Sequence, residues 1–448
     1  MSTITTTGTA VDQHGNPISA DPAAVALYDR AVDAWLRFHP DVVAHATMLA
    51  EHHGDVAMSH ALVAYLHLSS TQRPDAEVAR TAWQAMSTTP MGAREQAHHD
   101  AIGAWSAGRW HEAAQILDDL LVRWPADLLA LQQGHGLDFF VGDAANLRDR
   151  PGRSLSALDP THPHTGFVRG MQAFGLEESG HYEAAEDAGQ AAIEANPDDV
   201  WAIHAVTHTY EMRGLVDTGA RFLTQREADW GSGNLFTVHN WWHLALFHLE
   251  RGDLTAALAI YDREVHNESS DGVALEMLDA AALLWRFFLD GLDTGDRFDP
   301  LADAWVAAEA PPWYAFNDTH ATMALVGAGR MAEAEAVVAR LERYVIPAST
   351  EPDPGSNVAM ISEVGLPASR AVVAFGQGRW DDVVADLAPI RRRLQRFGGS
   401  HAQRDVLQRT LLEAALRAGR TDLARALISE RLAVRPTSAY AQAQLERL

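Results

Sequence analysis

Nine glycines recur along this chain of 448 residues at intervals of 34 to 49 positions. The stretch before each glycine has helical apolar spacing, and a second amphipathic stretch follows it. Glycine at the end of a helical stretch is typical of a turn that needs a left-handed backbone. The pattern therefore predicts an all-α protein built from repeated helix–turn–helix units. The nine residues are Gly108, Gly142, Gly180, Gly214, Gly252, Gly291, Gly329, Gly378 and Gly419.

One copy of the repeat shows the pattern clearly: TGFVRGMQAFGLEESGHYEAAEDAGQAAIEANPDD. Gly180 makes the turn, Tyr182 and Ala185 open the second helix, and Pro197 ends it. These are tetratricopeptide (TPR) spacings, in which small residues let paired helices approach and each pair buries its apolar face on its neighbours. We therefore predict one TPR-like α-solenoid domain over residues 23–448, preceded by a polar N-terminal arm at residues 1–22.

Residues 344–363 interrupt the repeat with the sequence YVIPASTEPDPGSNVAMISE. Proline, serine and glutamate in this number predict a loop insert. Such a loop either folds over the concave side as a lid or stays a passive solvated loop.

Composition excludes several kinds of chemistry. The chain has no cysteine, and its 35 basic residues are all arginine, which excludes thiolate sites, Schiff-base lysines and a phosphate-loop lysine. We therefore expect no organic cofactor. The 60 acidic residues give a formal charge of -25, which opposes binding to nucleic acid or an anionic membrane. No signal-like or membrane-spanning apolar run is apparent, so we expect a cytoplasmic protein without membrane or nucleic-acid partners.

Two histidine motifs fall on the predicted first helices of neighbouring repeats. HAVTHTYE places His204, His208 and Glu211 four and three residues apart, which puts them on one helical face. HNWWH places His239 and His243 on the corresponding face of the next repeat, about 10 Å away. First helices line the inner surface of a solenoid, so these side chains are expected to converge. Asn240 and Trp242 lie beside them as candidate ligand-binding residues.

Three uses of this cluster are chemically reasonable. His204, His208, His239 and His243 can hold a divalent metal, with Glu211 as ligand or base. A histidine near a carboxylate can instead act as a general acid or base. The same groups can also simply hydrogen-bond a polar ligand. The alternative is that these are ordinary packed histidines, since the chain has 22 of them.

Two later motifs begin further first helices. FNDTHATMAL offers Asn317, Asp318 and His320, although short polar residues at a helix start also serve as caps. GGSHAQRDVLQ offers a second set of candidates, in which the arginine either clamps a substrate carboxylate or pairs with the aspartate beside it. The candidates of this second motif are Gln403, Arg404 and Asp405.

At these motifs the chain resembles the tetratricopeptide repeat protein 38 family, from about residue 13 to near the C-terminus. The resemblance rests on HTGFVRGMQAFGLEESGHYEAAEDAGQAAIEANPDD, HAVTHTYEMRG, HNWWHLALFHLERGDLTAALAIYD, FNDTHATMAL and GGSHAQRDV. It implies a TPR-like superhelix, and the family's recurring polar motifs correspond to the candidates named above. It implies no particular reaction.

These observations predict a protein that binds a small molecule or a short peptide in a concave pocket rich in His, Asp and Glu. One alternative is a hydrolase or lyase, either metal-dependent or cofactor-independent. There His208 or His243 acts as acid–base, Glu211 or Asp318 as its partner, and Arg404 as anchor. Another alternative is a protein–protein scaffold, and a homo-oligomer is compatible with each of the three.

Overall fold

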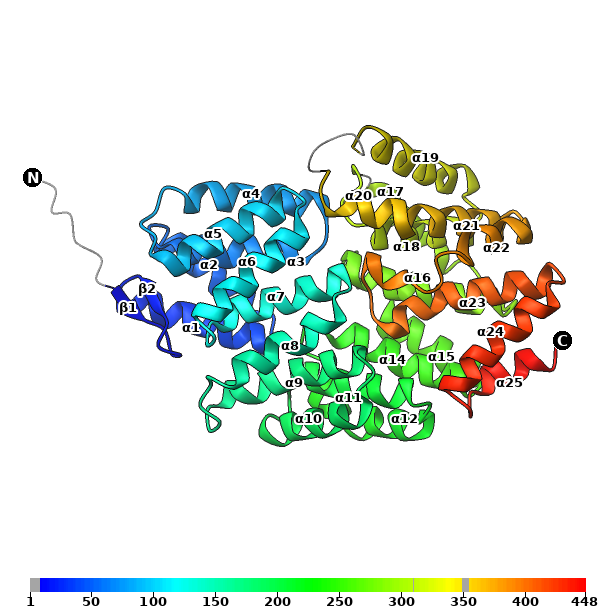
Figure 1. The fold of residues 1–448 in the computed structure, drawn as a ribbon, viewed down its shortest axis with the longest axis horizontal. Coiled ribbons are helices and arrows are strands. Elements are labelled where there is room, and N and C mark those ends of the chain that lie inside the picture. The colour runs from blue at the N-terminus through cyan, green and yellow to red at the C-terminus, as the bar shows by residue number, and fades with distance from the viewer. Residues whose placement is uncertain (1–8, 309, 349–353) are drawn as a thin grey trace, which may run out of the picture. The chain divides into compact units, whose positions relative to one another are not determined.

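Helices joined by short turns make up nearly all of the computed structural model (Figure 1), which describes residues 9–308, 310–348 and 354–448. This confirms the predicted all-α, TPR-like helical-repeat fold. The contacts between Cα atoms divide the chain into two units, where the sequence predicts a single domain. The first unit comprises residues 1–139, 144–205 and 232–236, and the second comprises 140–143, 206–231 and 237–448.

The first unit begins with a two-stranded antiparallel hairpin and continues with helical pairs. Its elements are β1 (Thr9–Val11), β2 (Pro17–Ser19), α1 (Pro22–Leu36), α2 (Asp41–His52), α3 (Ala57–Ser69), α4 (Arg73–Met86), α5 (Ala93–Ser106), α6 (Trp110–Arg123), α7 (Leu128–Val141, up to residue 139), α8 (Ala144–Leu155), α9 (Pro163–Glu178), α10 (Tyr182–Ala195) and the start of α11 (Val200–Met212).

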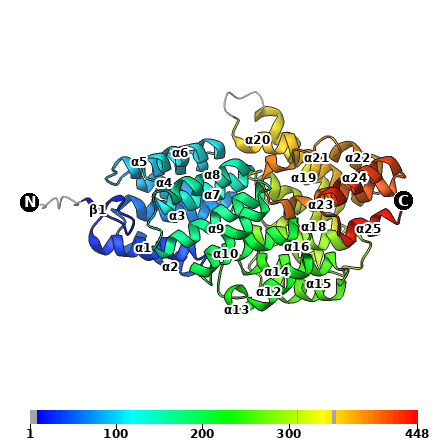
Figure 2. The ribbon, with the colours of Figure 1, turned by 60° about the horizontal axis from the view of Figure 1, so that its bottom comes forward.

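The second unit takes the rest of α11 and continues to the C-terminus (Figure 2). Its further elements are α12 (Val216–Gln225), α13 (Glu227–Trp230), α14 (Thr237–Glu250), α15 (Leu254–Ile260), the π-helix η1 (Tyr261–Val265), α16 (Ala274–Leu289), α17 (Phe298–Ala307), α18 (Ala315–Gly327), α19 (Met331–Ala348), α20 (Ser356–Met360), the π-helix η2 (Ile361–Gly365), α21 (Leu366–Gly376), α22 (Trp380–Leu387), the 3-10 helix η3 (Leu394–Phe397), α23 (His401–Arg417), α24 (Thr421–Val434) and α25 (Ala439–Leu445).

The recurrent glycines act as the sequence predicts. All nine have φ between 68° and 82°, which is the left-handed region that other residues avoid. At Gly180 the amide donates to the carbonyl of Glu177, and the next amide, of His181, donates back to Leu176. This arrangement satisfies carbonyls at the end of α9 and starts α10, so the repeated glycine sets where each helical pair turns.

Two segments differ from the sequence-based expectation. Residues 9–19 form the β1–β2 hairpin, and Asp12, Asn16 and Ile18 are buried in it, so this part of the predicted arm packs into the first unit. In the predicted loop 344–363, α19 continues to Ala348, and helix resumes at Ser356. The loop expectation is wrong there because apolar residues such as Val358, Met360 and Ile361 are buried. The centre of that segment, 349–353, lies outside the described residues.

One helical stretch of the described chain, Ser356–Gly376, is long and apolar enough to cross a membrane, and 67% of its window is buried. Ala368, Ala371 and Val372 are fully enclosed within the second unit. A buried apolar helix of this kind is what the core of a helical-repeat protein requires.

A buried carboxyl group starts α11. Asp199 accepts a hydrogen bond from the amide of Ala202 through Oδ1 at 2.9 Å and is buried. Burial raises the pKa of Asp199 to about 8, so the folded protein keeps this side chain protonated at neutral pH. In the unfolded chain an aspartate titrates near pH 4.

We therefore expect Asp199→Asn to remove part of the pH dependence of stability. Between pH 4 and 8 the folded state binds a proton that the unfolded state has lost. The free energy of unfolding thus falls as the pH rises through this window, by at most about 1.4 kcal/mol per pH unit, and levels off above it. Urea unfolding at pH 5, 6, 7 and 8 measures this effect. The free energy of unfolding of Asp199→Asn should rise relative to that of the parent protein as the pH rises. Asp187→Asn, at an exposed position on α10, should run parallel to the parent, and equal slopes for all three proteins contradict the assignment.

Candidate metal centre

Three histidines of the second unit come together between α11 and α14. His208 and His243 are fully buried, and the side chain of His239 is 14% exposed. A ring nitrogen of each lies within 4.8 Å of a ring nitrogen of the other two, and the rings of His208 and His243 have centroids 4.4 Å apart. The predicted convergence of the two histidine motifs is therefore present in the structure.

A carboxylate contacts the outer nitrogen of two of these rings. Nδ1 of His239 lies 2.6 Å from Oδ2 of Asp279, and Nδ1 of His243 lies 3.0 Å from Oε2 of Glu211. If both carboxylates are ionised they can only accept hydrogen bonds, and both Nδ1 atoms then carry the proton. Each neutral ring then presents the lone pair of Nε2 on its opposite side.

These two lone pairs face each other. Nε2 of His239 and Nε2 of His243 are 3.2 Å apart. Two unprotonated nitrogens at this distance repel unless a cation lies between them. Two nitrogens bound to one tetrahedral zinc at about 2.05 Å would lie about 3.3 Å apart. The observed separation therefore fits a shared metal ion.

Electrostatics favour the neutral form of His243. Burial lowers the pKa of His243 well below its usual value, and the nearby His208, His239 and Arg286 lower it further. Burial raises the pKa of Glu211. If Glu211 carried the proton in place of His243 Nδ1, the contact between the two Nε2 atoms would be an ordinary N–H···N hydrogen bond.

Asp279, on α16, is a site residue that sequence reasoning missed. Besides holding His239, it accepts a hydrogen bond from Nε2 of Gln403 at 3.2 Å. It thereby links α14, α16 and α23, and it brings one residue of the GGSHAQRDVLQ motif to the histidines. The available signal was an isolated aspartate inside the apolar run MLDAAALLW, because a buried charge in a core helix needs a partner.

Arg286 is the second such residue, two helical turns after Asp279 on α16. It is buried and donates to the carbonyls of Ala282 and Ala402 at 2.9 and 2.7 Å. Its guanidinium also lies 5.4 Å from the ring centre of Trp242, which stacks on His239. The predicted Trp242 therefore forms a wall between a buried cation and the histidines.

The FNDTHATMAL motif divides between two faces of α18. Residues two apart on a helix point to different sides, so Asp318 and His320 have separate surroundings. Asp318 lies 3.7 Å from Arg340, and burial raises its pKa to about 6. His320 donates through Nδ1 to the carbonyl of Phe316 at 2.8 Å, and burial lowers its pKa to about 4. The structure therefore gives Asp318 an arginine partner instead of the predicted histidine.

Arg404 and Asp405 also contact other residues of the second unit. The guanidinium of Arg404 donates to the carbonyl of Gly399. Asp405 does not pair with Arg404, which was the alternative to a role of Arg404 in substrate binding. It lies 2.6 Å from Arg431 and 3.3 Å from Arg409. Burial raises the pKa of Asp405, but the arginines override this effect and hold the pKa well below its usual range.

The remaining predicted residues are buried near the start of the cluster's helices. His204 precedes His208 by one turn of α11 but belongs to the first unit, where its ring lies 5.0 Å from that of Trp201. Asn240 is fully buried on α14, and neither atom of its amide has a hydrogen-bond partner among the described residues. Asn317 is buried at the start of α18.

A small cavity of about 30 Å³ lies beside Glu211, with Arg286, Asp405, Arg409 and Arg435 among its lining residues. One water needs roughly 10–15 Å³ of such volume, whereas small-molecule pockets measure about 300–1,000 Å³. This cavity therefore accommodates water and not a metabolite.

No protein-family model matches the chain. Solved structures with a similar arrangement include human IFIT1 dimers with PPP-AAAA and with m7Gppp-AAAA. They show 12% and 14% identity and TM-scores of 0.42 and 0.36, over 98% of this chain and 95% of theirs. Another is the APC/C heterotetramer Cut9–Hcn1, with 11% identity and a TM-score of 0.41, over 95% of this chain and 76% of that one.

We expect Asp405→Asn to destabilise the second unit, because it leaves Arg431 without its buried counter-charge. Removing one partner of a buried ion pair costs about 3–5 kcal/mol. Glu430→Gln is the control: its pairs with Arg391 and Arg392 are exposed, and such pairs contribute about 0–1 kcal/mol. Urea unfolding measures both variants, and equal small losses would mean that Asp405 is not held as described.

Proposed function

We propose that this chain binds one divalent metal ion, such as zinc, through His208, His239 and His243, and that the ion serves hydrolysis of a small polar molecule or short peptide. The observation that carries the proposal is the 3.2 Å contact between two Nε2 atoms whose opposite nitrogens both face carboxylates.

The arrangement around the histidines supports a metal. Metal-binding histidines usually donate their second ring N–H to a carboxylate, which fixes the tautomer and orients the ring. Asp279 and Glu211 stand in that position behind His239 and His243. The two carboxylates also offset the charge that a divalent ion brings into a buried site.

Catalysis at this site requires an open position on the ion. Structural zinc sites use four protein ligands, whereas three leave a position for water or substrate. A bound ion would lower the pKa of that water and polarise a carbonyl. Asn240, buried without an amide partner among the described residues, is a polar group near the histidines that could hydrogen-bond a substrate.

A pure protein–protein scaffold explains these features less well. It needs no buried polar cluster on its first helices, yet here α11, α14, α16 and α23 are joined by Glu211–His243, His239–Asp279 and Asp279–Gln403 contacts.

Membership of the tetratricopeptide repeat protein 38 family and a cytoplasmic location are part of the same proposal.

Metal analysis of tag-free protein is the test. Purified or zinc-reconstituted parent protein should contain one equivalent more than His239→Ala or His243→Ala, because each substitution removes a ligand. His248→Ala, on the same helix α14 but paired with Asp253, should keep the parent's content. Identical metal content in His243→Ala and the parent, with both folded by circular dichroism, would mean that the two rings share only a proton.

Asp279→Asn should weaken zinc binding by about 10- to 100-fold without removing a ligand, because outer carboxylates orient the histidine and raise its basicity. Competition with a chromophoric chelator measures the affinity. An unchanged dissociation constant would show that Asp279 has no role behind a metal-bound His239.

A further inference from the structure

A second group of histidines gathers in the first unit, on segments far apart in the sequence. His14 lies in the turn between β1 and β2, while His162 caps α9 and His164 lies in its first turn. Their ring centroids are 4.6 to 5.1 Å apart. One ring nitrogen of each lies within 4.8 Å of those of the other two.

A carboxylate stands behind one of these rings. Nε2 of His164 donates to Oδ1 of Asp33 on α1 at 2.9 Å, so the neutral ring keeps a lone pair on Nδ1. That atom lies 3.0 Å from Nε2 of His14. A carboxylate, a buried histidine and a second imidazole thus follow one another, as around His239 in the second unit.

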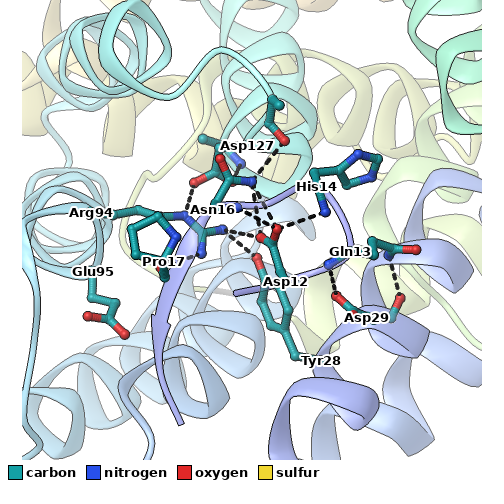
Figure 3. Close-up of polar contacts among 12 residues, drawn as sticks. Asp12, Gln13, His14, Asn16, Pro17, Tyr28, Asp29, Arg94, Glu95 and Asp127 are labelled. Atoms are coloured by element: carbon teal, nitrogen blue, oxygen red, sulfur yellow. Dashed lines mark hydrogen bonds and ion pairs between the residues drawn. The ribbon is translucent and has the colours of Figure 1, made fainter. Parts of the chain in front are cut away.

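The position of His14 is set by a buried polar network (Figure 3). Its backbone amide donates to Oδ1 of Asp12 at 3.0 Å, and Asp12 pairs with Arg94 at 3.2 Å. Arg94 in turn contacts Asp127 at 2.6 Å, and all three charged groups are buried. Figure 3 shows the imidazole of His14 extending away from this network.

The same network anchors the rest of the hairpin turn. Asn16 donates from Nδ2 to both carboxylate oxygens of Asp12 and to the carbonyl of Ala126 at 3.0 Å. A ligand held on such a support loses little freedom on binding. The turn therefore presents His14 to α9 in a defined position.

We propose that His14, His162 and His164 form a zinc site, independent of the His208 cluster, that fastens the N-terminal hairpin to the start of α9. Three imidazoles without thiolates suit zinc and its neighbours cobalt, nickel and copper. His14 and His164 are the principal ligands, and Asp33 orients His164.

His162 is the weakest of the three ligands. Its Nδ1 accepts the backbone N–H of His164 at 3.1 Å, so the neutral ring carries its proton on Nε2. Binding the ion through Nε2 moves that proton to Nδ1 and ends the capping bond. His162→Asn keeps a capping side chain and should weaken zinc binding less than His14→Ala or His164→Ala does.

Zinc titration of tag-free full-length protein against a chromophoric chelator tests this site. We expect His14→Ala and His164→Ala each to lose one equivalent, and Asp33→Asn to bind that equivalent 10- to 100-fold more weakly. His52→Ala, at an exposed position on α2, should match the parent. The same titration in His243→Ala distinguishes the two sites, because in that variant only the zinc equivalent assigned to the His14 site remains.

Hydrogen exchange adds a measurement that can be made on the parent protein itself. Zinc should slow amide exchange in residues 12–19 of the parent and of His243→Ala, and should leave it unchanged in Asp33→Asn at zinc concentrations that saturate only the parent. The proposal is overturned if His243→Ala binds no zinc at micromolar concentrations, or if His14→Ala and His52→Ala bind it equally. Either result leaves His14 and His164 joined by a simple hydrogen bond.

Discussion

Burial of one helical pair against the next is the constraint on which the rest of this structure depends. Each pair is too small to enclose its own apolar face, so the first helices of consecutive repeats pack into the interior. Any polar side chain on those helices is then removed from water and must find a partner. Helix α16 illustrates this, because Asp279 and Arg286 lie in an apolar helix and both are bonded to side chains or carbonyls of other helices.

In both units, carboxylates contact histidine rings and set their tautomers. Asp279, Glu211 and Asp33 each contact one ring nitrogen and thereby determine which nitrogen is left with a lone pair. In the His208 cluster this leaves two lone pairs facing each other, and in the first unit it directs the Nδ1 of His164 toward His14. The same arrangement of carboxylate and imidazole thus occurs once within each unit, and both metal proposals rest on it.

Other ionic groups of the interior serve the fold. Arg94 with Asp127 supports the hairpin turn, and Asp405 with Arg431 joins α23 to α24. In each pair an arginine neutralises a buried carboxylate, and Asp127 also contacts Nε2 of His98 at 2.9 Å.

The sequence by itself determined the repeat, since a glycine at each turn and apolar spacing on both sides are local requirements of a helical pair, and all nine glycines have the expected backbone. It also located the helices that carry His208, His239 and His243, because side chains four apart share a face. Only the tertiary structure decided which residues from other repeats meet them. The contacts of Asp279 with His239 and of His14 with His164 depend on packing between segments 40 and 150 residues apart, which helical periodicity does not encode.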